Sequence, residues 1–299
     1  MEVSTSRTTL ANVLPPIFIC TIVGTIWSIY LGLHLLPMLQ LGSSQPTVYS
    51  KALFQTIVSQ FLTGMFAICF ARSLLGSPGS VPDDFATDSL TMREVKATGE
   101  KRYCKWCHNY KPDRCHHCRT CQSCILKMDH HCPWIMNCVG FRNHKYFFLL
   151  VVYAVANCLF ICFTLVESVQ RSVVEETPST DRFLLVLGLV LSIIMGFLMS
   201  CFLSFHTWLM LKGMTTIEFC EKNLSVAADK SKTPLSYDRG FITNIEAVLG
   251  PHWYLWFLPT SPPEGNGLQF TSAAGKFDKK FDKKLHSEPE RTGQREATP

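Results

Sequence analysis

The chain contains four apolar runs, each about 20 residues long or longer, and these runs constrain its fold more than any other feature. Each is long enough to cross the ~30 Å hydrocarbon core of a bilayer as a helix. Hydrophobic residues make up 47% of the chain and charged residues 17%, so buried helices of a soluble core would leave too little polar surface. The sequence therefore predicts an α-helical integral membrane protein with four transmembrane helices, at Val13–Leu39, Ala52–Leu75, Tyr146–Val166 and Phe183–Leu211.

The distribution of lysine and arginine predicts how these helices are oriented. The segment between the second and third runs, Gly76–Lys145, is rich in both, whereas the loops 40–51 and 167–182 carry few. Loops rich in lysine and arginine stay in the cytosol, so we expect this segment and both termini on the cytosolic side. The N-glycosylation acceptor pattern at Asn223-Leu224-Ser225 should then carry no glycan, because it would lie in the cytosol. The first run has only Arg7 before it and no small-residue cleavage site, which does not fit a signal peptide.

Eight of the 14 cysteines are concentrated in the segment between the second and third runs. Repeated C-x2-C steps favour metal ligation over disulfides. The segment has little periodic apolar pattern, so a metal would have to supply folding energy, on the order of 10 kcal/mol or more per structural zinc. Two zinc ions need eight Cys or His ligands, and the segment offers more candidates than that, so spacing alone leaves the assignment open. The cysteines are Cys104, Cys107, Cys115, Cys118, Cys121, Cys124, Cys132 and Cys138.

Within this segment, Asp129-His130-His131-Cys132 places a thiol close to a base and a carboxylate. A free cysteine is only a few per cent thiolate at neutral pH, so a nucleophilic cysteine needs a base to take its proton. The pattern indicates cysteine chemistry at a bilayer surface. The alternative is that Asp129 and His130 lie in a solvated turn of a zinc knuckle, because neighbouring side chains can point apart.

At these residues the chain resembles a known family. C-x2-C, then K-P-D-R-C-H-H-C-x2-C-x2-C, then D-H-H-C-P-W-x2-N-C-V-G-x2-N are similar to the signature domain of the DHHC protein S-acyltransferases (palmitoyltransferases), from Tyr103 to about Phe147. Thr215-Thr216-Ile217-Glu218 matches the family's TTxE motif, and Tyr237–Leu249 resembles its amphipathic C-terminal element. The four-span layout agrees as well. Ser77-Pro78-Gly79 departs from the family's usual Asp-Pro-Gly.

The resemblance implies two interleaved zinc sites, each with three cysteines and one histidine. Cys132 and His130 are then unligated, which suits a nucleophile and its base, and Cys115 is a structural or inert thiol. The first site would be Cys104, Cys107, His117 and Cys124, and the second Cys118, Cys121, His131 and Cys138.

The resemblance also implies a two-step reaction. Cys132, with His130 as its base and Asp129 orienting the imidazole, would attack the thioester of a long-chain acyl-CoA such as palmitoyl-CoA. A cysteine of a substrate protein at the cytosolic face of the bilayer would then take the acyl chain from the enzyme. Thioester is exchanged for thioester, so this ping-pong scheme needs no ATP and predicts a detectable acyl-enzyme.

Family position also suggests which residues contact the acyl donor. A cavity between the helices would keep the acyl chain out of water, because each buried methylene is worth about 0.8 kcal/mol. Phe147 and Leu150 are candidate liners, with lipid-facing or packing roles as the alternative. Lys111 and Arg114 are candidate partners of the CoA phosphates, although solvated charges would explain them equally well. Trp134 suits the membrane interface or the mouth of the acyl pocket.

Four further polar residues are singled out by motif or by position. The TTxE motif suggests that Thr216 forms a hydrogen bond near Asp129, and Asn244 stands at the family's asparagine in the C-terminal element. Asn157 and His206 lie within the apolar runs. They could face a bundle interior or a water-filled cavity, but interhelical hydrogen bonding, or an interfacial position for His206, is the preferred interpretation.

The chain divides into 1–75 with the first two helices, 76–145 as the cytosolic zinc domain, 146–211 with the last two helices, and 212–299 as a cytosolic C-terminal region. The aromatic residues at 253–257 suit an interfacial anchor or packing on the bundle. The repeat at 276–285 fits a short basic helix on an anionic leaflet or a chance pattern in a disordered tail, and 287–299 is expected to be disordered.

Composition and motif together rank three functions. A transferase is favoured because Asp129, His130 and Cys132 are all present. A zinc-stabilised scaffold would be expected to lack them, and a transporter would be expected to carry more ionisable residues in its spans. The net charge of +5 is modest and indicates no nucleic-acid partner. We expect a multi-pass protein of the endomembrane system, in the Golgi or endoplasmic reticulum ahead of the plasma membrane.

Overall fold

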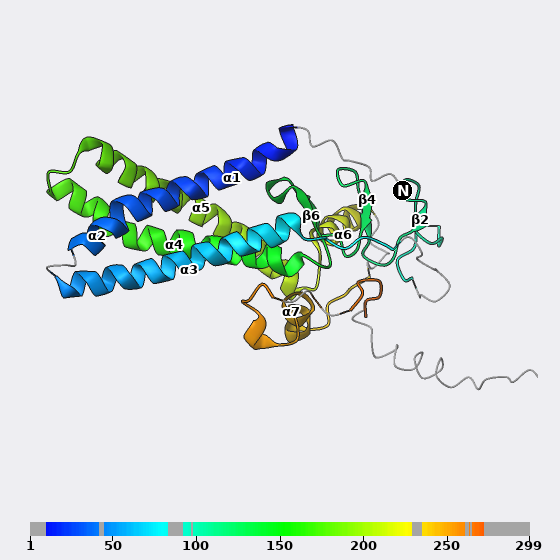
Figure 1. The fold of residues 1–299 in the computed structure, drawn as a ribbon. Coiled ribbons are helices and arrows are strands. Elements are labelled where there is room, and N and C mark those ends of the chain that lie inside the picture. Colours follow the sequence, from blue (N-terminus) through cyan, green and yellow to red (C-terminus); the bar gives the residue numbers. More distant parts are fainter. Residues whose placement is uncertain are drawn as a thin grey trace, which may run out of the picture.

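Four long helices lying side by side dominate the computed structural model, which describes residues 10–41, 45–82, 92–96, 98–228, 235–260, 263 and 265–271 (Figure 1). All four are long and apolar enough to cross a membrane, at Val13–Leu41, Pro46–Leu75, His144–Val174 and Ser179–Leu211. The prediction of four spans is confirmed. The helices extend a few residues beyond most of the apolar runs, because polar residues at their ends continue the same backbone hydrogen bonding.

The first span is built from three consecutive pieces, α1 (Leu10–Ile29), a π-helical turn (Tyr30–Leu35) and α2 (Leu36–Leu41). The other spans are α3 (Pro46–Leu75), α4 (His144–Val174) and α5 (Ser179–Leu211). Close approach of the helices relies on small side chains: a Cβ atom at Gly188 of α5 would lie 2.8 Å from Ile29. Such small residues let apolar helices pack backbone to backbone in lipid.

Buried polar side chains also connect the helices. His34 forms hydrogen bonds with Ser168 (2.7 Å) and with Gln55 (2.9 Å), and so connects the first span to α4 and α3. Asn157 donates from its amide to Thr63 Oγ1 at 3.1 Å, which is the interhelical hydrogen bond expected for it. Each contact satisfies a polar group that lipid could not.

The cysteine-rich segment lies at one end of the bundle, beyond the C-terminal end of α3 and the N-terminal end of α4 (Figure 1). It contains three antiparallel hairpins whose strands are only two or three residues long. Strands this short cannot form a core of their own. The pairs are β1 (Tyr103–Cys104) with β2 (Asn109–Tyr110), β3 (His116–Cys118) with β4 (Ser123–Ile125), and β5 (His130–Cys132) with β6 (Asn137–Val139).

Hydrogen bonds join this segment to the end of α3. The Asn137 amide donates to the backbone oxygens of Ser73 (3.0 Å) and Gly76 (2.8 Å), which helix termination leaves without partners. Ser77 stands where the family usually has the Asp of Asp-Pro-Gly. Its hydroxyl oxygen accepts a hydrogen bond from the Gly79 backbone N–H at 3.2 Å. A serine oxygen can make the turn contact that an aspartate would make, so the substitution leaves the connection intact.

The C-terminal region wraps the same end of the bundle with α6 (Thr216–Ala228), α7 (Phe241–Leu249) and a short 3-10 turn at Trp253–Leu255. Helix α7 buries Ile245 and Val248 against Phe148 and Met210 of α4 and α5. Trp253 is 74% exposed, so packing on the bundle does not account for it. The basic repeat at 276–285, residues 287–299 and the side chains of the acceptor pattern at 223–225 lie outside the described residues.

Candidate active site and metal centres

The first hairpins gather one group of metal-binding atoms. His117 Nδ1 lies 3.3 Å from Cys107 Sγ and 3.9 Å from Cys124 Sγ. The four ligand atoms of Cys104, Cys107, His117 and Cys124 all lie within 4.8 Å of one another. His117 and Cys124 face each other across the β3–β4 ladder, so strand pairing itself brings two of the atoms together. Cys115 is fully buried against this group.

A second group interleaves with the first along the chain. His131 Nδ1 lies 3.5 Å from Cys121 Sγ and 3.6 Å from Cys138 Sγ, and Cys118 Sγ lies 3.7 Å from the same nitrogen. His131 pairs directly with Cys138 in the β5–β6 ladder. The four side chains come from two hairpins, β3–β4 and β5–β6, and their ligand atoms lie within 4.8 Å of one another.

The ligand spacing of the second group fits a tetrahedral ion closely. With metal–sulfur bonds of about 2.3 Å and metal–nitrogen bonds of about 2.0–2.1 Å, neighbouring ligand atoms should lie roughly 3.6–3.8 Å apart. The distances within the second group, 3.5 to 3.7 Å, are close to that value. The two clusters could therefore hold metal ions, and three thiolates with one imidazole is a ligand set typical of zinc.

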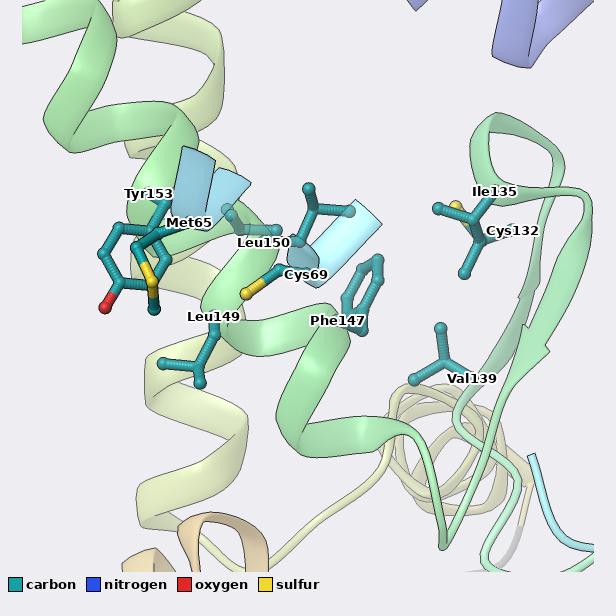
Figure 2. Packing of buried hydrophobic residues seen from close by; sticks show 10 residues of the cluster. Met65, Cys69, Cys132, Ile135, Val139, Phe147, Leu149, Leu150 and Tyr153 are labelled. Atoms are coloured by element: carbon teal, nitrogen blue, oxygen red, sulfur yellow. The ribbon is translucent and has the colours of Figure 1, made fainter. Parts of the chain in front are cut away.

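Strand geometry explains why adjacent residues of Asp129-His130-His131-Cys132 have different surroundings. Side chains alternate between the two faces of a strand, and His130, His131 and Cys132 form β5. His131 therefore turns toward the second metal cluster, while His130 and Cys132 share the opposite face. On that face Cys132 belongs to the buried apolar cluster that also contains Phe147 and Leu150 of α4 and Cys69 of α3. Figure 2 shows Cys132 on the side of the hairpin that faces these helices.

Asp129 is 1% exposed and is surrounded by donors. His130 Nδ1–H donates to Oδ2 at 2.6 Å, the Thr216 backbone N–H donates to Oδ1 at 2.9 Å, and the Thr216 hydroxyl donates to Oδ2 at 2.8 Å. Burial alone would raise the pKa of this carboxyl, but the His130 hydrogen bond and the nearby imidazoles outweigh burial and hold the pKa well below its usual range. Asp129 is thus an anion at neutral pH.

The pKa of His130 is shifted in the opposite direction from that of Asp129. Burial would lower the pKa of its imidazole, but the hydrogen bonds with Asp129 and Cys132 outweigh burial and raise the pKa to about 9. The raised pKa makes the imidazole a stronger base than an isolated histidine, so it can hold a proton taken from the Cys132 thiol while Asp129 stabilises the cation. Its edge packs on Phe147, with ring centroids 5.1 Å apart.

His206 of α5 also belongs to this site, and sequence reasoning missed it. Its ring is buried 5.7 Å from the His130 ring and packs on Phe147 and Phe202. Its ligand atom lies within 4.8 Å of those of Asp129 and His130. The sequence held a weak signal for this position, a histidine within an apolar run, and the interhelical or interfacial interpretation set it aside.

The remaining sequence candidates are distributed around this centre. Trp134 is half exposed, with its ring 6.3 Å from Phe18 of α1, which places it beside the first span. Lys111 is half-buried in the first hairpin region. The Asn244 amide donates to Leu211 O at 2.9 Å and to Asp238 Oδ1 at 2.7 Å. Asn244 therefore connects the C-terminal element to the end of α5.

Arg114 is held by protein contacts. Its guanidinium donates to Glu218 Oε1 at 2.6 Å, to Glu218 Oε2 at 2.8 Å and to the Gly213 carbonyl at 2.9 Å, and it lies 4.4 Å from the centre of the Tyr237 ring. This two-point ion pair joins the cysteine-rich segment to the TTxE motif. The same motif supplies the two donors of Thr216 to Asp129, so the Arg114–Glu218 pair positions the carboxylate indirectly.

Comparison with known proteins identifies the family of the chain. Residues 97–223 match the family model described as DHHC palmitoyltransferase. The chain is 33% identical over 244 residues to "Probable protein S-acyltransferase 16" of Arabidopsis thaliana, which covers 77% of this chain and 83% of that protein. It is 30% identical to "Palmitoyltransferase PFA3" of Candida albicans, covering 86% of this chain and 79% of that protein. The match to "Palmitoyltransferase ZDHHC15" of Mus musculus, at 38% identity, spans 58% of this chain and 51% of that protein.

The family match and these relatives make the chain a protein acyltransferase, and its four long apolar helices are those of a multi-pass membrane protein. The chain belongs to the DHHC palmitoyltransferase family.

Proposed function

We propose that this protein transfers a long-chain acyl group, such as palmitoyl, from acyl-CoA to cysteine thiols of proteins through an S-acyl intermediate on Cys132. The observation that carries the proposal is the position of Cys132. Its thiol shares one strand face with His130, whose other ring nitrogen donates to the buried Asp129 at 2.6 Å, and it lies in an apolar cluster contributed by α3 and α4.

The first step transfers the chain to the enzyme. His130 accepts the thiol proton, and the Cys132 sulfur attacks the thioester carbonyl of acyl-CoA. The bond from the carbonyl carbon to the CoA sulfur breaks, and the protonated His130 returns its proton to the departing CoA thiolate. Asp129 remains ionised throughout and stabilises the imidazolium.

The second step repeats the same exchange with a protein substrate. A substrate thiol gives its proton to His130 and attacks the S-acyl carbonyl, and Cys132 leaves and regains the proton. One thioester is broken and one is formed in each step, so the bond energies balance and no other reactant is required.

The acyl donor would lie between the membrane helices and the cysteine-rich segment. Phe147 and Leu150 line the apolar cluster around Cys132, and a cavity of about 70 Å³ lies deeper, between α1, α3, α4 and α5. These surfaces would receive the acyl chain, with Trp134 at the bilayer boundary. Lys111 would contact the CoA phosphates. Arg114 would act chiefly by holding the TTxE motif, because Glu218 already occupies its guanidinium, and Thr216 and Asn244 would act through their contacts with Asp129 and the end of α5.

The two metal clusters would each hold a structural Zn²⁺, bound by Cys104, Cys107, His117 and Cys124 and by Cys118, Cys121, His131 and Cys138. The ligand distances and the shortness of the hairpin strands support this assignment. His131 binding would hold β5 in place and thereby direct His130 and Cys132 to the opposite face. Zinc has no further role in the reaction scheme.

The distribution of basic residues supports a cytosolic cysteine-rich domain, residues 76–145, with both termini on the same side. The described ends of the chain and this domain lie at one end of the bundle (Figure 1). The substrates would then be proteins that present cysteines at the cytosolic face of an endomembrane, in the Golgi or endoplasmic reticulum ahead of the plasma membrane.

Autoacylation tests the proposal. The purified, zinc-loaded chain is incubated in detergent with labelled palmitoyl-CoA and then treated with neutral hydroxylamine, which cleaves thioesters. We expect hydroxylamine-labile label on the wild type and on Cys220→Ala, a control that removes an exposed thiol of α6, and no label on Cys132→Ala. Equal labelling of Cys132→Ala, or no label on a folded wild type, would favour a zinc-stabilised scaffold instead.

A further inference from the structure

A second, polar cavity of about 350 Å³ lies at the junction of the cysteine-rich segment, the ends of α4 and α5, and the C-terminal region. Asp129, His130 and Cys132 do not line it. Its walls carry three cationic side chains and one imidazole, from four different parts of the chain: Arg114, Lys127, Arg239 and His144.

Lys127 is the least compensated of these cations. It is only 6% exposed, and its ammonium makes one long hydrogen bond, 3.5 Å to the Ala247 carbonyl. Within the described part of the chain no carboxylate lies within ion-pair distance of it. A buried ammonium without a partner is costly, so a site that retains one has room for an anion.

Two further observations also indicate that the cavity can bind an anion. The Nδ1 atom of His144 is buried at the cavity wall and has no hydrogen-bond partner. Arg239, which also lines the cavity, donates from one guanidinium nitrogen to the Thr271 hydroxyl at 2.6 Å and is exposed. Arg114 contributes little net charge because Glu218 neutralises it, and Glu246 is the one acidic residue among the described lining residues.

The electrostatic environment of Lys127 also favours an anion at this site. Burial, followed by repulsion from Arg114 and Arg239, lowers the pKa of Lys127 to about 7, although Glu218 and Asp129 act in the opposite direction. An anion between Lys127 and Arg239 would relieve both the burial cost and the repulsion.

We propose that this cavity binds a phosphate-bearing anion, held by Lys127 and Arg239 with His144 as a further hydrogen-bonding group. Its volume exceeds what one inorganic phosphate would fill, and it opens beyond the ends of two membrane helices, where lipid phosphates lie. The shared chemistry is a phosphate monoester, from an anionic lipid headgroup or from a soluble organic phosphate. The inference goes beyond acyl transfer: the ligand would join the loop that precedes Asp129 to the C-terminal region and stabilise that junction.

The melting temperature of the zinc-loaded full chain in lipid nanodiscs tests the inference without any turnover. One arm adds inositol hexakisphosphate to nanodiscs of phosphatidylcholine, with sodium chloride at matched ionic strength as the reference. The other arm compares phosphatidylcholine nanodiscs with and without phosphatidylinositol 4,5-bisphosphate. We expect a saturable rise of the melting temperature in at least one arm, because a ligand that binds only the folded state stabilises it. A rise in the first arm assigns a soluble phosphate, and a rise confined to the second assigns a lipid headgroup.

Lys127→Met should weaken probe binding by about tenfold or more, since it removes a charge-assisted contact. It should also melt no lower than wild type without ligand, because it removes a buried charge. Arg239→Gln, at an exposed position, should also weaken binding. Lys105→Met, which removes an exposed lysine of the cysteine-rich segment, should bind as wild type does.

Three results would overturn the inference. The first is no rise with either probe. The second is an undiminished rise in both Lys127→Met and Arg239→Gln. The third is displacement of bound inositol hexakisphosphate by coenzyme A at equal concentration, which would assign the cavity to the acyl donor.

Discussion

Thr216→Val tests whether the hydroxyl that reaches Asp129 supports catalysis. The substitution keeps the shape and the β-branching of the side chain and removes only the donor to Oδ2, at 2.8 Å. The backbone N–H of residue 216, 2.9 Å from Oδ1, and His130 Nδ1–H, 2.6 Å from Oδ2, remain. The buried carboxylate therefore keeps two of its three donors.

The size of the effect follows from what remains. A hydrogen bond to a charged group contributes about 1.5–3 kcal/mol, and one pKa unit corresponds to about 1.4 kcal/mol. Loss of the hydroxyl should thus raise the pKa of Asp129 by about 1–2 units. Because that pKa is held well below its usual range, the carboxylate stays ionised at neutral pH. We expect the acylation rate to fall by roughly tenfold, far less than for Asp129→Asn, where loss of the anion favours the wrong imidazole tautomer and costs about 10⁴-fold in comparable triads.

The assay is the single-turnover rate of acyl-enzyme formation at saturating palmitoyl-CoA. Thr215→Val is the matched control, because the Thr215 hydroxyl accepts the Glu218 backbone N–H at 3.2 Å and does not contact Asp129; it should lower the melting temperature with little effect on the rate. A wild-type rate for Thr216→Val would refute the supporting role of the hydroxyl. A rate as low as that of Asp129→Asn would refute the argument from the two remaining donors.

Three further predictions follow from buried charge and from the metal clusters. Glu218→Gln should destabilise the fold by about 3 kcal/mol or more, seen as a lower melting temperature, because it leaves the guanidinium of Arg114 buried without its anion; an unchanged melting temperature would contradict this. Removal of zinc by a chelator should expose the cysteine-rich segment to proteolysis and abolish autoacylation, since its strands are two or three residues long; a metal-free chain that stays protected would contradict the structural role. The stability of the wild type should rise with pH from about 7 toward 10.5, by up to about 1.4 kcal/mol per unit, because Lys127 has a pKa of about 7 when folded and near 10.5 when unfolded. Between these two pH values the unfolded chain binds one proton more than the folded chain. In the folded chain the charges that act on the ammonium are Arg114, Glu218, Asp129 and Arg239. Lys127→Met should lack this slope, and an equal slope in the variant would exclude Lys127 as its origin.

The four membrane-type helices could be predicted from the sequence because they depend on local properties. A run of about 20 apolar residues meets the length that a bilayer demands, and no distant contact is needed to recognise it. The structure changes only the ends, where polar residues such as His144 and Ser179 continue the helices.

The residue types of the candidate site could also be predicted from the sequence, but their division into two metal-ligand groups could not. The spacing of the cysteines and histidines indicates metal binding and leaves the ligand sets open. Strand register, which pairs His117 with Cys124 and His131 with Cys138, gathers two separate groups. The resemblance implied the same two groups from the family's pattern, not from spacing.

Sequence by itself determined which reactive groups are present and that they lie beside a membrane, because residue identity and apolar length are properties of the chain. Tertiary structure decided which groups meet. Alternation along β5 sends His131 to a metal cluster and His130 to the thiol, and folding over a separation of 87 residues brings Thr216 to Asp129. The cavity beside Lys127 likewise brings Arg239, more than a hundred positions away in the chain, to the cysteine-rich segment. Contacts between residues so distant depend on packing of the whole chain, and no local pattern records them.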